Sequence, residues 1–571
     1  MNDKRTLLGF LLIGIIFVLA PYYYEWMGIS PKPLEPNGEE EVLDGLEREE
    51  RERTRKESRE MVARDTPRTS SVSAPPPVSS NPRSEIETLS EKSFVSQKVK
   101  VETPLYSLEF DSQGGLLVSA KLKKYSLFDG QPVQLINLNS NALGLSLRHM
   151  NGAVESLTKT EFKPDRDRIR LQAELETETL VLSADLGGGR FVAKEFTFYS
   201  DSYGFDCVLK YRGFSKDVDA EIRWEGGIPF TEELIEYDLP EMGALASFGV
   251  DDERIEVKVD DGETSSWDDN GYVQWLGIRS KYFLAAIIPE GGKKERYGGE
   301  ISGDRTGRGS IPNYGFRLSQ QLSRDGSWSN RVFVGPLDYD NLVREDSGLE
   351  QAIDFGFPVI RTISKFILIV FKEAYNYIPN YGWIIVLFSL VLKVLTYPLT
   401  VKSMRSMAKM QEIAPKLNAL KEKYKNDKER LSQETMKMYK EEGANPVGGC
   451  LPMVLQMPIF FALYQIFSTT LLFRQSPFAL WITDLSVPDV VEVGGIPLRI
   501  LPLLMALSMF VQQKMTMKDP KQIAIVYIMP VVLIFFFWSM SSGLVLYWTL
   551  FNVFSIIQQH FTGKSSSVQH P

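Results

Sequence analysis

The sequence predicts a polytopic α-helical membrane bundle joined to a large extracytoplasmic all-β domain. Apolar segments long enough to span a bilayer recur from Phe357 onward. Before them, short runs of alternating polarity are separated by turn residues over 99–345. The charge is divided in the same way. From Pro358 onward 21 Lys and Arg stand against 12 Asp and Glu, and the rest of the 571 residues holds 43 against 61. Two environments are therefore expected.

The first segment, 1–26, predicts a membrane anchor. Lys4 and Arg5 precede an apolar run that ends at Ala20, and an aromatic cluster follows it. A cleaved signal peptide has the same charged start and apolar core. However, Pro21 disfavours cleavage after Ala20, and aromatic residues gather at membrane interfaces. The segment is therefore predicted to be an uncleaved transmembrane anchor with its N-terminus in the cytoplasm.

The next two segments differ in composition. Residues 27–98 are charged and then rich in Pro and Ser, so this linker is expected to be disordered. Residues 99–345 contain runs such as "LYSLEF" and "FVAKEFTFY", with turn signals such as "DSQGG" between them. This pattern predicts a sizeable antiparallel β sandwich.

The remaining chain predicts five further spans. Residues 357–378 space their basic residues four and seven apart, which is typical of an amphipathic helix at the membrane surface. The membrane core, 379–560, follows, and 561–571 form a short tail. The predicted spans are Tyr381–Leu399, Cys450–Phe473, Pro497–Gln512, Ile523–Met540 and Leu544–Ile557. With the anchor, six spans result.

The loop charges predict the orientation of these spans. The segment 402–442 is rich in Lys and Arg, so it is expected in the cytoplasm. The loop 474–496 holds three acidic residues and one arginine, so it is expected outside. Lys514, Lys518 and Lys521 place the next loop inside. Both termini are then cytoplasmic, and the β domain lies on the outer side of the membrane.

Lys393 lies in the middle of an apolar run, "LFSLVLKVLTYPLT". A charge near the bilayer centre costs about 2.5–3.5 kcal/mol on insertion scales. The lysine could snorkel, because Lys402 is about 13 Å further along a helix. Yet Ser389, Thr396 and Thr400 share its helix face. A snorkelling lysine needs no such polar stripe, so a water-filled cavity is favoured and snorkelling remains the alternative.

Other spans carry amides that fit such a cavity. Gln456, Gln465 and Asn552 lie within apolar segments, where amides usually face partners or water. Each alone could be a simple interhelical hydrogen bond. No acidic residue lies deep in the five C-terminal spans. A cavity with uncompensated positive charge is predicted to attract an anionic guest.

The segment 401–445 predicts a cytoplasmic helical hairpin. Its apolar residues follow three-and-four spacing, and "KND" supplies the turn. A self-packed antiparallel pair is one reading, and an adaptable surface for varied apolar ligands is the other. The methionines that favour such a surface are Met404, Met407, Met410, Met436 and Met438.

Composition argues against several function classes. The two cysteines, Cys207 and Cys450, offer no zinc spacing, and three histidines do not favour a histidine cluster. No glycine loop for phosphate and no nucleic-acid motif is present. No metal, cofactor or catalytic residue is therefore expected, and the chain is not expected to be an enzyme.

Four motifs resemble those of the YidC-type membrane protein insertases. They are "LTYPLTVKSMRSMAKM", "NPVGGCLPMVLQMPIFFALYQ", "SPFALWITDLS" and "SGLVLYWTLFNVFSIIQQ". The anchor, linker and outer domain resemble the Gram-negative form of the family. The outer domain is then similar to the β-supersandwich of sugar-mutarotase-like proteins, and the location is the bacterial inner membrane.

This resemblance implies an insertase and chaperone for newly made membrane proteins, alone or with the Sec translocon. A five-helix core would form a hydrophilic groove open to the cytoplasm and the lipid bilayer. Lys393 would take the position of the groove cation, Ser389 the neighbouring polar position and Gln456 a groove amide. Tyr547 and Trp548 fall where family aromatics contact clients. Many relatives carry arginine at the cation position, so net charge is expected to matter more than guanidinium geometry. The short tail implies weak or absent ribosome docking.

Two rival functions remain open. A secondary transporter could bind a small anion at Lys393, although no internal repeat is seen. A sugar-active outer domain would need a histidine beside a carboxylate. The one histidine of that domain is His149, in "LRHMNG". Uptake of small anions into proteoliposomes would separate transport from client insertion.

Overall fold

The computed structural model describes residues 96–137, 140–173, 175–307, 311–444, 451–516 and 523–566. All of them belong to one unit, Phe94–Pro571. The predicted anchor, all but the end of the linker, Cys450, the loop around Lys518 and the last residues of the tail lie outside the described residues.

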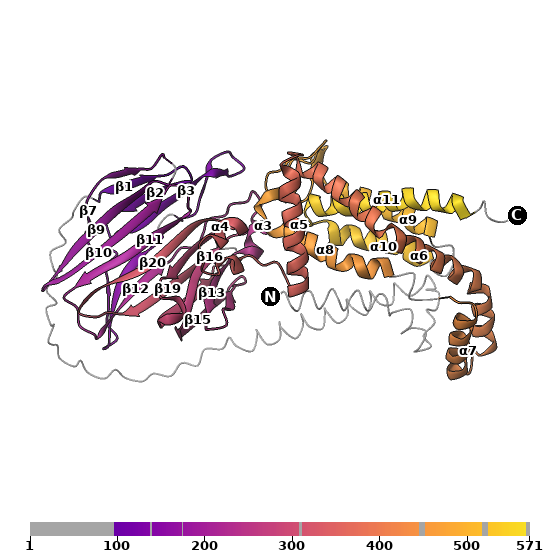
Figure 1. Ribbon diagram of the computed structural model, residues 1–571, viewed down its shortest axis with the longest axis horizontal. Helices are drawn as coiled ribbons and strands as arrows, with labels where there is room; N and C mark the ends of the chain where they lie inside the picture. The colour runs from indigo at the N-terminus through magenta and orange to yellow at the C-terminus, as the bar shows by residue number, and fades with distance from the viewer. Residues whose placement is uncertain are drawn as a thin grey trace, which may run out of the picture. The chain divides into compact units, whose positions relative to one another are not determined.

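A nine-stranded antiparallel sheet is the centre of the β domain, with the order β14-β13-β16-β17-β20-β11-β10-β9-β7 (Figure 1). Buried and half-exposed residues alternate along several of its strands, as expected for a sheet with one face in the core. Its strands are β7 (Lys163–Pro164), β9 (Thr177–Gly187), β10 (Arg190–Tyr199), β11 (Gly204–Arg212), β13 (Gly243–Phe248), β14 (Glu253–Val257), β16 (Val273–Arg279), β17 (Phe283–Pro289) and β20 (Asp325–Pro336).

Two smaller sheets pack against it. One has the order β4-β3-β2-β1-β8 and the other β15-β18-β19-β12-β5-β6. Phe110 in the first sheet lies 4.6 Å, centroid to centroid, from Phe196 of β10, and β18 and β19 of the second contact β16. Their strands are β1 (Lys98–Glu102), β2 (Tyr106–Asp111), β3 (Leu116–Ser126), β4 (Pro132–Gln134), β5 (Gly144–His149), β6 (Val154–Ser156), β8 (Arg168–Arg170), β12 (Val218–Trp224), β15 (Thr264–Gly271), β18 (Tyr297–Asp304) and β19 (Asn313–Gln321).

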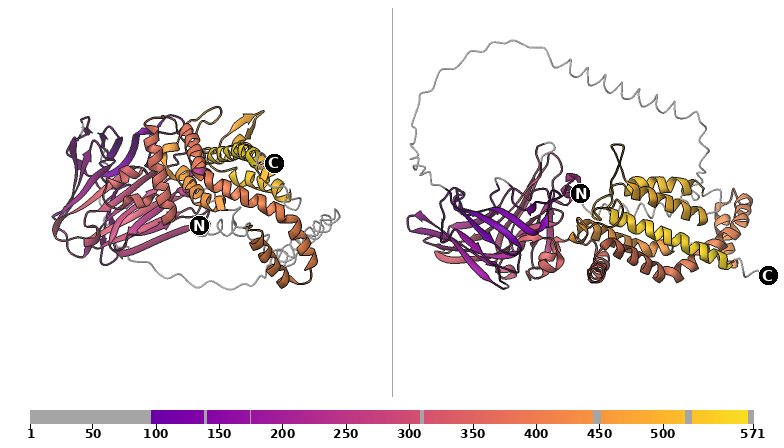
Figure 2. Two further views of the ribbon diagram at one scale, coloured as in Figure 1. Left: turned by 45° about the vertical axis from the view of Figure 1, so that its right-hand side comes forward. Right: turned by 90° about the horizontal axis from the view of Figure 1, so that it is seen from above.

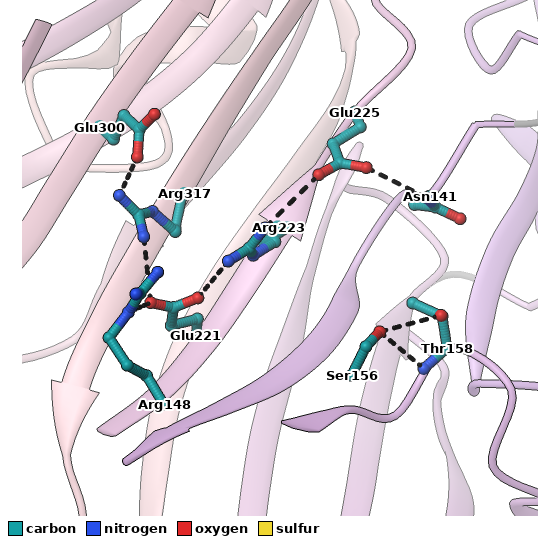
Figure 3. A network of polar contacts seen from close by, with 9 residues as sticks. All are labelled: Asn141, Arg148, Ser156, Thr158, Glu221, Arg223, Glu225, Glu300 and Arg317. Carbon is teal, nitrogen blue, oxygen red and sulfur yellow. Dashed lines mark hydrogen bonds and ion pairs between the residues drawn. The ribbon is translucent and has the colours of Figure 1, made fainter. Parts of the chain in front are cut away.

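A charged network lies on the six-stranded sheet (Figure 3). The carboxylate of Glu221 is buried and accepts hydrogen bonds from Arg148, Arg223 and Arg317. Arg317 also bridges to Glu300 on β18. Because these residues come from β5, β12, β18 and β19, the network ties four strands together, and each charge has an opposite partner.

The C-terminal half is helical. Helices α6, α8, α9, α10 and α11 lie together, with α11 touching α6, α8 and α9 (Figures 1 and 2). The prediction of a largely β-sheet domain followed by a helical region is confirmed. The helices are α3 (Ile235–Asp238), α4 (Tyr339–Val343), α5 (Pro358–Tyr375), α6 (Tyr381–Lys423), α7 (Lys428–Glu441), α8 (Leu451–Thr469), α9 (Ile500–Thr516), α10 (Ile523–Phe537) and α11 (Ser542–Ser566). A small β-hairpin between α8 and α9 consists of β21 (Val491–Val493) and β22 (Ile496–Leu498). Short 3₁₀ turns cover Leu239–Glu241, Gly292–Lys294, Leu349–Ala352 and Leu471–Phe473.

Helix α6 is a single helix of 43 residues. The sequence divides it at about residue 401, where the apolar span gives way to the first arm of the predicted hairpin. The structure continues without a break through Pro398 and Pro415. The second arm is α7, whose N-terminus is capped by the side chain of Asp427. The first arm of the hairpin is therefore a continuation of the same helix as the apolar segment.

Among the described residues, α6 is the helix that is long and apolar enough to cross a membrane. Val454–Thr469, Ile500–Met515 and Val526–Phe537 are apolar but shorter. Many of their large side chains are exposed, for example Leu395, Leu507 and Phe535. Exposed apolar surface on this scale marks contact with lipid or with a partner.

Helix α5 has the amphipathic character that its sequence predicts. Its Ile367 and Phe371 are buried, and two of its basic residues contact the segment that follows β20. Lys372 forms ion pairs with Asp338 and Asp340, and Lys365 lies over the ring of Tyr339. Lys365 and Lys372 are thus used for contacts within the chain.

Candidate functional site

Lys393 is buried between α6 and α11. Its side chain is 7% exposed, and its Nζ donates a hydrogen bond of 2.7 Å to Oγ of Ser555. The ammonium also lies 4.6 Å from the ring centroid of Phe551. Within the part of the chain that the structure describes, no carboxylate lies within ion-pair distance of Lys393. The charge is therefore held by one neutral hydroxyl and one aromatic face.

The hydroxyls of the polar stripe on α6 bond to their own helix. Ser389 is fully buried and donates to the carbonyl of Ile385, and Thr396 donates to Leu392. Thr400 donates to Thr396 in the same way. Thr396 also lies 3.3 Å from the backbone carbonyl of Lys393. Such bonds to the preceding turn are common for Ser and Thr in apolar helices. In all of them the stripe hydroxyls are donors, so none of them involves the ammonium of Lys393.

The partners of Lys393 come from α11, and sequence reasoning missed them. Phe551 and Ser555 are four residues apart, so they lie on one helix face. Tyr547 continues that face one turn earlier, with its ring centroid 6.0 Å from Phe551. The four-residue spacing of Tyr547, Phe551 and Ser555 is a signal that could have found them.

The predicted amides and aromatics spread over several interfaces. Asn552 donates to Oγ of Ser508 on α9 at 3.2 Å. Trp548 packs on Phe460 of α8 and Phe537 of α10, with centroids 4.9 and 5.6 Å apart. Asn552 and Trp548 thus join α11 to its other neighbours.

Tyr547 is buried and Gln456 is half-buried. The hydroxyl of Tyr547 has no hydrogen-bond partner among the described residues. Lys393 uses one of its three donors, on Ser555. The ammonium of Lys393 and the hydroxyl of Tyr547 therefore both keep unused hydrogen-bonding capacity.

The methionines of the hairpin are divided between the two arms. Met404, Met407 and Met410 lie on the cytoplasmic-side extension of α6 predicted above and are half-buried. On α7, Met438 is half-buried and Met436 is exposed. Four of the five methionines are half-buried and one is exposed, which fits two hairpin helices that pack on each other and leave an apolar edge.

A second buried cation, Arg474, follows α8. Its Nε donates to Glu232 of the β domain at 2.8 Å. Its other two nitrogens donate to the carbonyls of Ser126 and Thr231 at 2.8 and 2.9 Å. Both side chains of the ion pair are almost fully buried. Burial raises the pKa of the Glu232 carboxyl, and the Arg474 guanidinium opposes that rise.

His149 is the histidine that the sugar-active alternative would use, and it lies at the end of β5. Nε2 of His149 lies 3.7 Å from Glu155, but Arg190 already binds that carboxylate at 2.8 Å. A cavity of about 540 Å³ lies elsewhere in the domain, and Asp206 and Glu345 line it. His149 is not among the residues that line this cavity.

These features define a class: a membrane protein with an all-β domain and an apolar helical bundle that buries Lys393 without a carboxylate partner among the described residues. Sequence comparisons agree. The model of the YidC periplasmic domain matches residues 98–370, and that of the 60Kd inner membrane protein family matches 373–569.

Individual relatives match along nearly the whole chain. The membrane protein insertase YidC of Syntrophus aciditrophicus is 32% identical over 99% of this chain and 100% of its own length. That of Chlorobaculum parvum is 30% identical over 99% of this chain and 95% of its own length. A crystal structure of an active YidC insertase, at 18% identity, covers 82% of this chain and 92% of its own with a TM-score of 0.33. On the strength of the sequence relatives, this chain belongs to the YidC family of inner membrane proteins with a periplasmic domain.

Proposed function

We propose that this chain is a membrane protein insertase and chaperone that integrates newly made inner-membrane proteins, alone or with the Sec translocon. The curated relatives carry the name membrane protein insertase, and the family is not one of catalytic enzymes. The observation that carries the proposal is the state of Lys393. It is buried beside Ser555 and Phe551, with no carboxylate partner among the described residues.

The proposed role of Lys393 is to receive the acidic end of a client. An ammonium has three donors, and one of them is used here. A client carboxylate would accept a hydrogen bond in which both partners are charged, and such a bond is stronger than the bond to the neutral hydroxyl of Ser555. In a site of low dielectric this attraction is larger than in water.

The surrounding residues would form a hydrophilic groove open to the cytoplasm and to lipid. Ser389 and Thr396 would border the cation, and Gln456 and Asn552 would supply amides. Tyr547 and Trp548 would contact the client. Water in the groove would shorten the dry path that a polar segment must cross. The client's own apolar helix would then move into the bilayer and supply the driving force.

The proposed architecture has six spans with a five-helix core and both termini in the cytoplasm. Residues 1–26 would be the anchor, 27–98 the linker, and 99–345 a periplasmic β-supersandwich that docks Sec components. Residues 357–378 would lie at the membrane surface, and 379–560 would form the insertase core. The hairpin 401–445 would offer its methionines to apolar clients. Ribosome binding through 561–571 would be weak.

Substitution of Lys393 tests this function. With Lys393→Ala, insertion of clients with acidic translocated tails should fall by about tenfold or more, because a hydrogen bond to a charged group contributes about 1.5–3 kcal/mol. Lys393→Arg keeps the charge and should be tolerated, whereas Lys393→Glu should be worse than alanine. Insertion of a client with a neutral tail is the matched control. An alanine variant that inserts acidic clients at the normal rate would refute the role of the charge.

Site-specific crosslinking gives an independent test. Photoreactive residues at positions 393, 456 and 547 should crosslink to a stalled nascent membrane protein. Failure of all three positions, with the hairpin crosslinking normally, would move the client path away from α11.

A further inference from the structure

Leu480 combines two unfavourable features. Its side chain is 90% exposed, and its backbone has a φ of 59°. A left-handed conformation is uncommon for residues other than glycine and is strained for a bulky side chain. The left-handed backbone is strained, and exposure of the leucine side chain to water is unfavourable. Such strain persists where the surroundings impose it, and it often marks a contact that the molecule uses.

The loop around Leu480 imposes this conformation. Phe478 donates its N–H to the carbonyl of Ile482 at 3.0 Å, and Ile482 donates to Ala479 at 3.1 Å. Trp481 is anchored through its indole N–H, which donates to Asp489 at 2.9 Å. The tip is therefore closed on both sides of Leu480, which is held pointing outward.

The same loop is seated on the first turn of α6. The ring of Phe478 lies edge-on to Trp383, with centroids 5.4 Å apart. Phe478 approaches so closely that a Cβ at Gly382 would lie 2.0 Å from its Cδ2. Trp383 is itself 56% exposed. Tryptophan at the end of an apolar helix is typical of the level of the lipid headgroups.

We propose that Leu480 inserts into the outer leaflet of the bilayer and fixes the beginning of α6 at the lipid–water interface. The occupant is phospholipid, because the tip is continuous through Phe478 and Trp383 with the exposed apolar face of α6. The inference rests on the membrane orientation proposed above and requires nothing of Lys393. Insertion of the leucine removes it from water, so the strained tip gains a favourable environment.

Leu175 provides a matched control. It also has a φ of 59° and is 81% exposed, but it lies in the β domain just before β9. The two leucines share their conformation and exposure, and Leu480 is the one whose loop contacts α6. Any difference between probes at 480 and 175 therefore reports the surroundings of the side chain.

The experiment places an environment-sensitive fluorophore on a single cysteine at each position. The full-length chain with Cys207→Ala and Cys450→Ser carries either Leu480→Cys or Leu175→Cys. Each protein is reconstituted into phosphatidylethanolamine–phosphatidylglycerol vesicles, with or without lipids brominated near the top of the acyl chain. Emission from position 480 should be blue-shifted and several times weaker in brominated vesicles, and emission from position 175 should not change.

Three outcomes would overturn the proposal. If brominated lipid does not quench the emission from position 480, lipid does not surround that side chain. A blue shift without quenching would assign the apolar surroundings of position 480 to a protein or to a second copy of the chain. Equal quenching at both positions would remove the distinction on which the proposal rests. If the cysteine variants do not fold, a photoreactive residue at position 480 of the otherwise unchanged chain should form a phospholipid adduct, and its absence would refute the insertion. Loss of client insertion in Lys393 variants would leave these lipid readouts unaltered, so the two proposals fail separately.

Discussion

Arg474 and Lys393 are both buried cations, and the chain supports them in opposite ways. All three nitrogens of Arg474 have acceptors, one of them the carboxylate of Glu232. Lys393 has one hydroxyl and one ring. Arg474 joins a loop to the β domain, whereas Lys393 lies between two apolar helices.

The difference separates a charge that stabilises the fold from a charge that can still bind a further group. A buried cation with a complete set of partners is costly to disturb, because its loss leaves a carboxylate buried and unpaired. A buried cation with few partners pays its desolvation cost without full compensation. Such a group is retained where its charge is used, so the support around each cation predicts what its removal does.

The largest effect should come from Arg474→Ala. Removal of the guanidinium leaves Glu232 buried without its partner, so the free energy of unfolding should fall by about 3–5 kcal/mol. Denaturant unfolding of the full-length chain in detergent measures this change. Glu232→Gln in the Arg474→Ala background should recover part of the loss, because it removes the orphaned charge. If the free energy of unfolding falls by less than about 1 kcal/mol, Arg474 contributes no more than an exposed ion pair. The contrast between Arg474 and Lys393 would then be wrong.

A third buried cation, Lys194, sharpens the comparison through pH. Its Nζ donates to the carbonyls of Gly114, Gly115 and Leu143 at 2.8–3.0 Å, and burial lowers the pKa of Lys194 to about 8. Between about pH 8 and 10.5 the folded state has lost this proton while the unfolded state still binds it. Stability should therefore rise with pH across that window, by roughly 3 kcal/mol at most.

Lys194→Met is the control for that titration. The variant lacks the ammonium, so the difference between its pH profile and that of the parent isolates the lysine. A parent profile that matches the variant would mean that three carbonyls fully offset burial of the charge. The case that Lys393 is undersupported would then weaken, because neutral acceptors alone would suffice.

The smallest stability effect should come from Lys393→Met. Methionine has a similar length and no charge to desolvate, and Ser555 keeps its hydrogen bond to the carbonyl of Phe551. The free energy of unfolding should change by about 1 kcal/mol or less, while insertion of acidic clients should be lost. Unfolding in detergent and client insertion into vesicles measure the two quantities. A loss of stability comparable to that of Arg474→Ala would make Lys393 a structural residue.

The sequence predicted what depends on local periodicity. The alternation in "LYSLEF" and "FVAKEFTFY" predicted the β domain, and the spacing around Lys393 correctly placed Ser389 and Thr396 on its face. The pairing of α6 with α11 was beyond that reasoning. The four-residue spacing of Phe551 and Ser555 places them on one face of α11, but the spacing alone does not show that this face turns toward Lys393.

Arg474 and α6 show two other limits. A single arginine in an acidic loop looks like a solvated charge, and its pairing with Glu232 links residues far apart in the sequence. The change from apolar to basic residues at about 401 divided the chain into a span, Tyr381–Leu399, and a separate hairpin, 401–445. The backbone nevertheless remains helical through both prolines, since a proline removes one hydrogen bond but need not end a helix.

The continuity of α6 has a mechanical consequence. Its 43 residues measure about 65 Å along the helix axis, and Lys423 follows Lys393 by about 45 Å of that axis. A lean of roughly 10° pivoting at Lys393 would sweep the far end through about 8 Å. A small displacement at Lys393 would therefore become a large displacement of α7, and bending at Pro398 or Pro415 would reduce it.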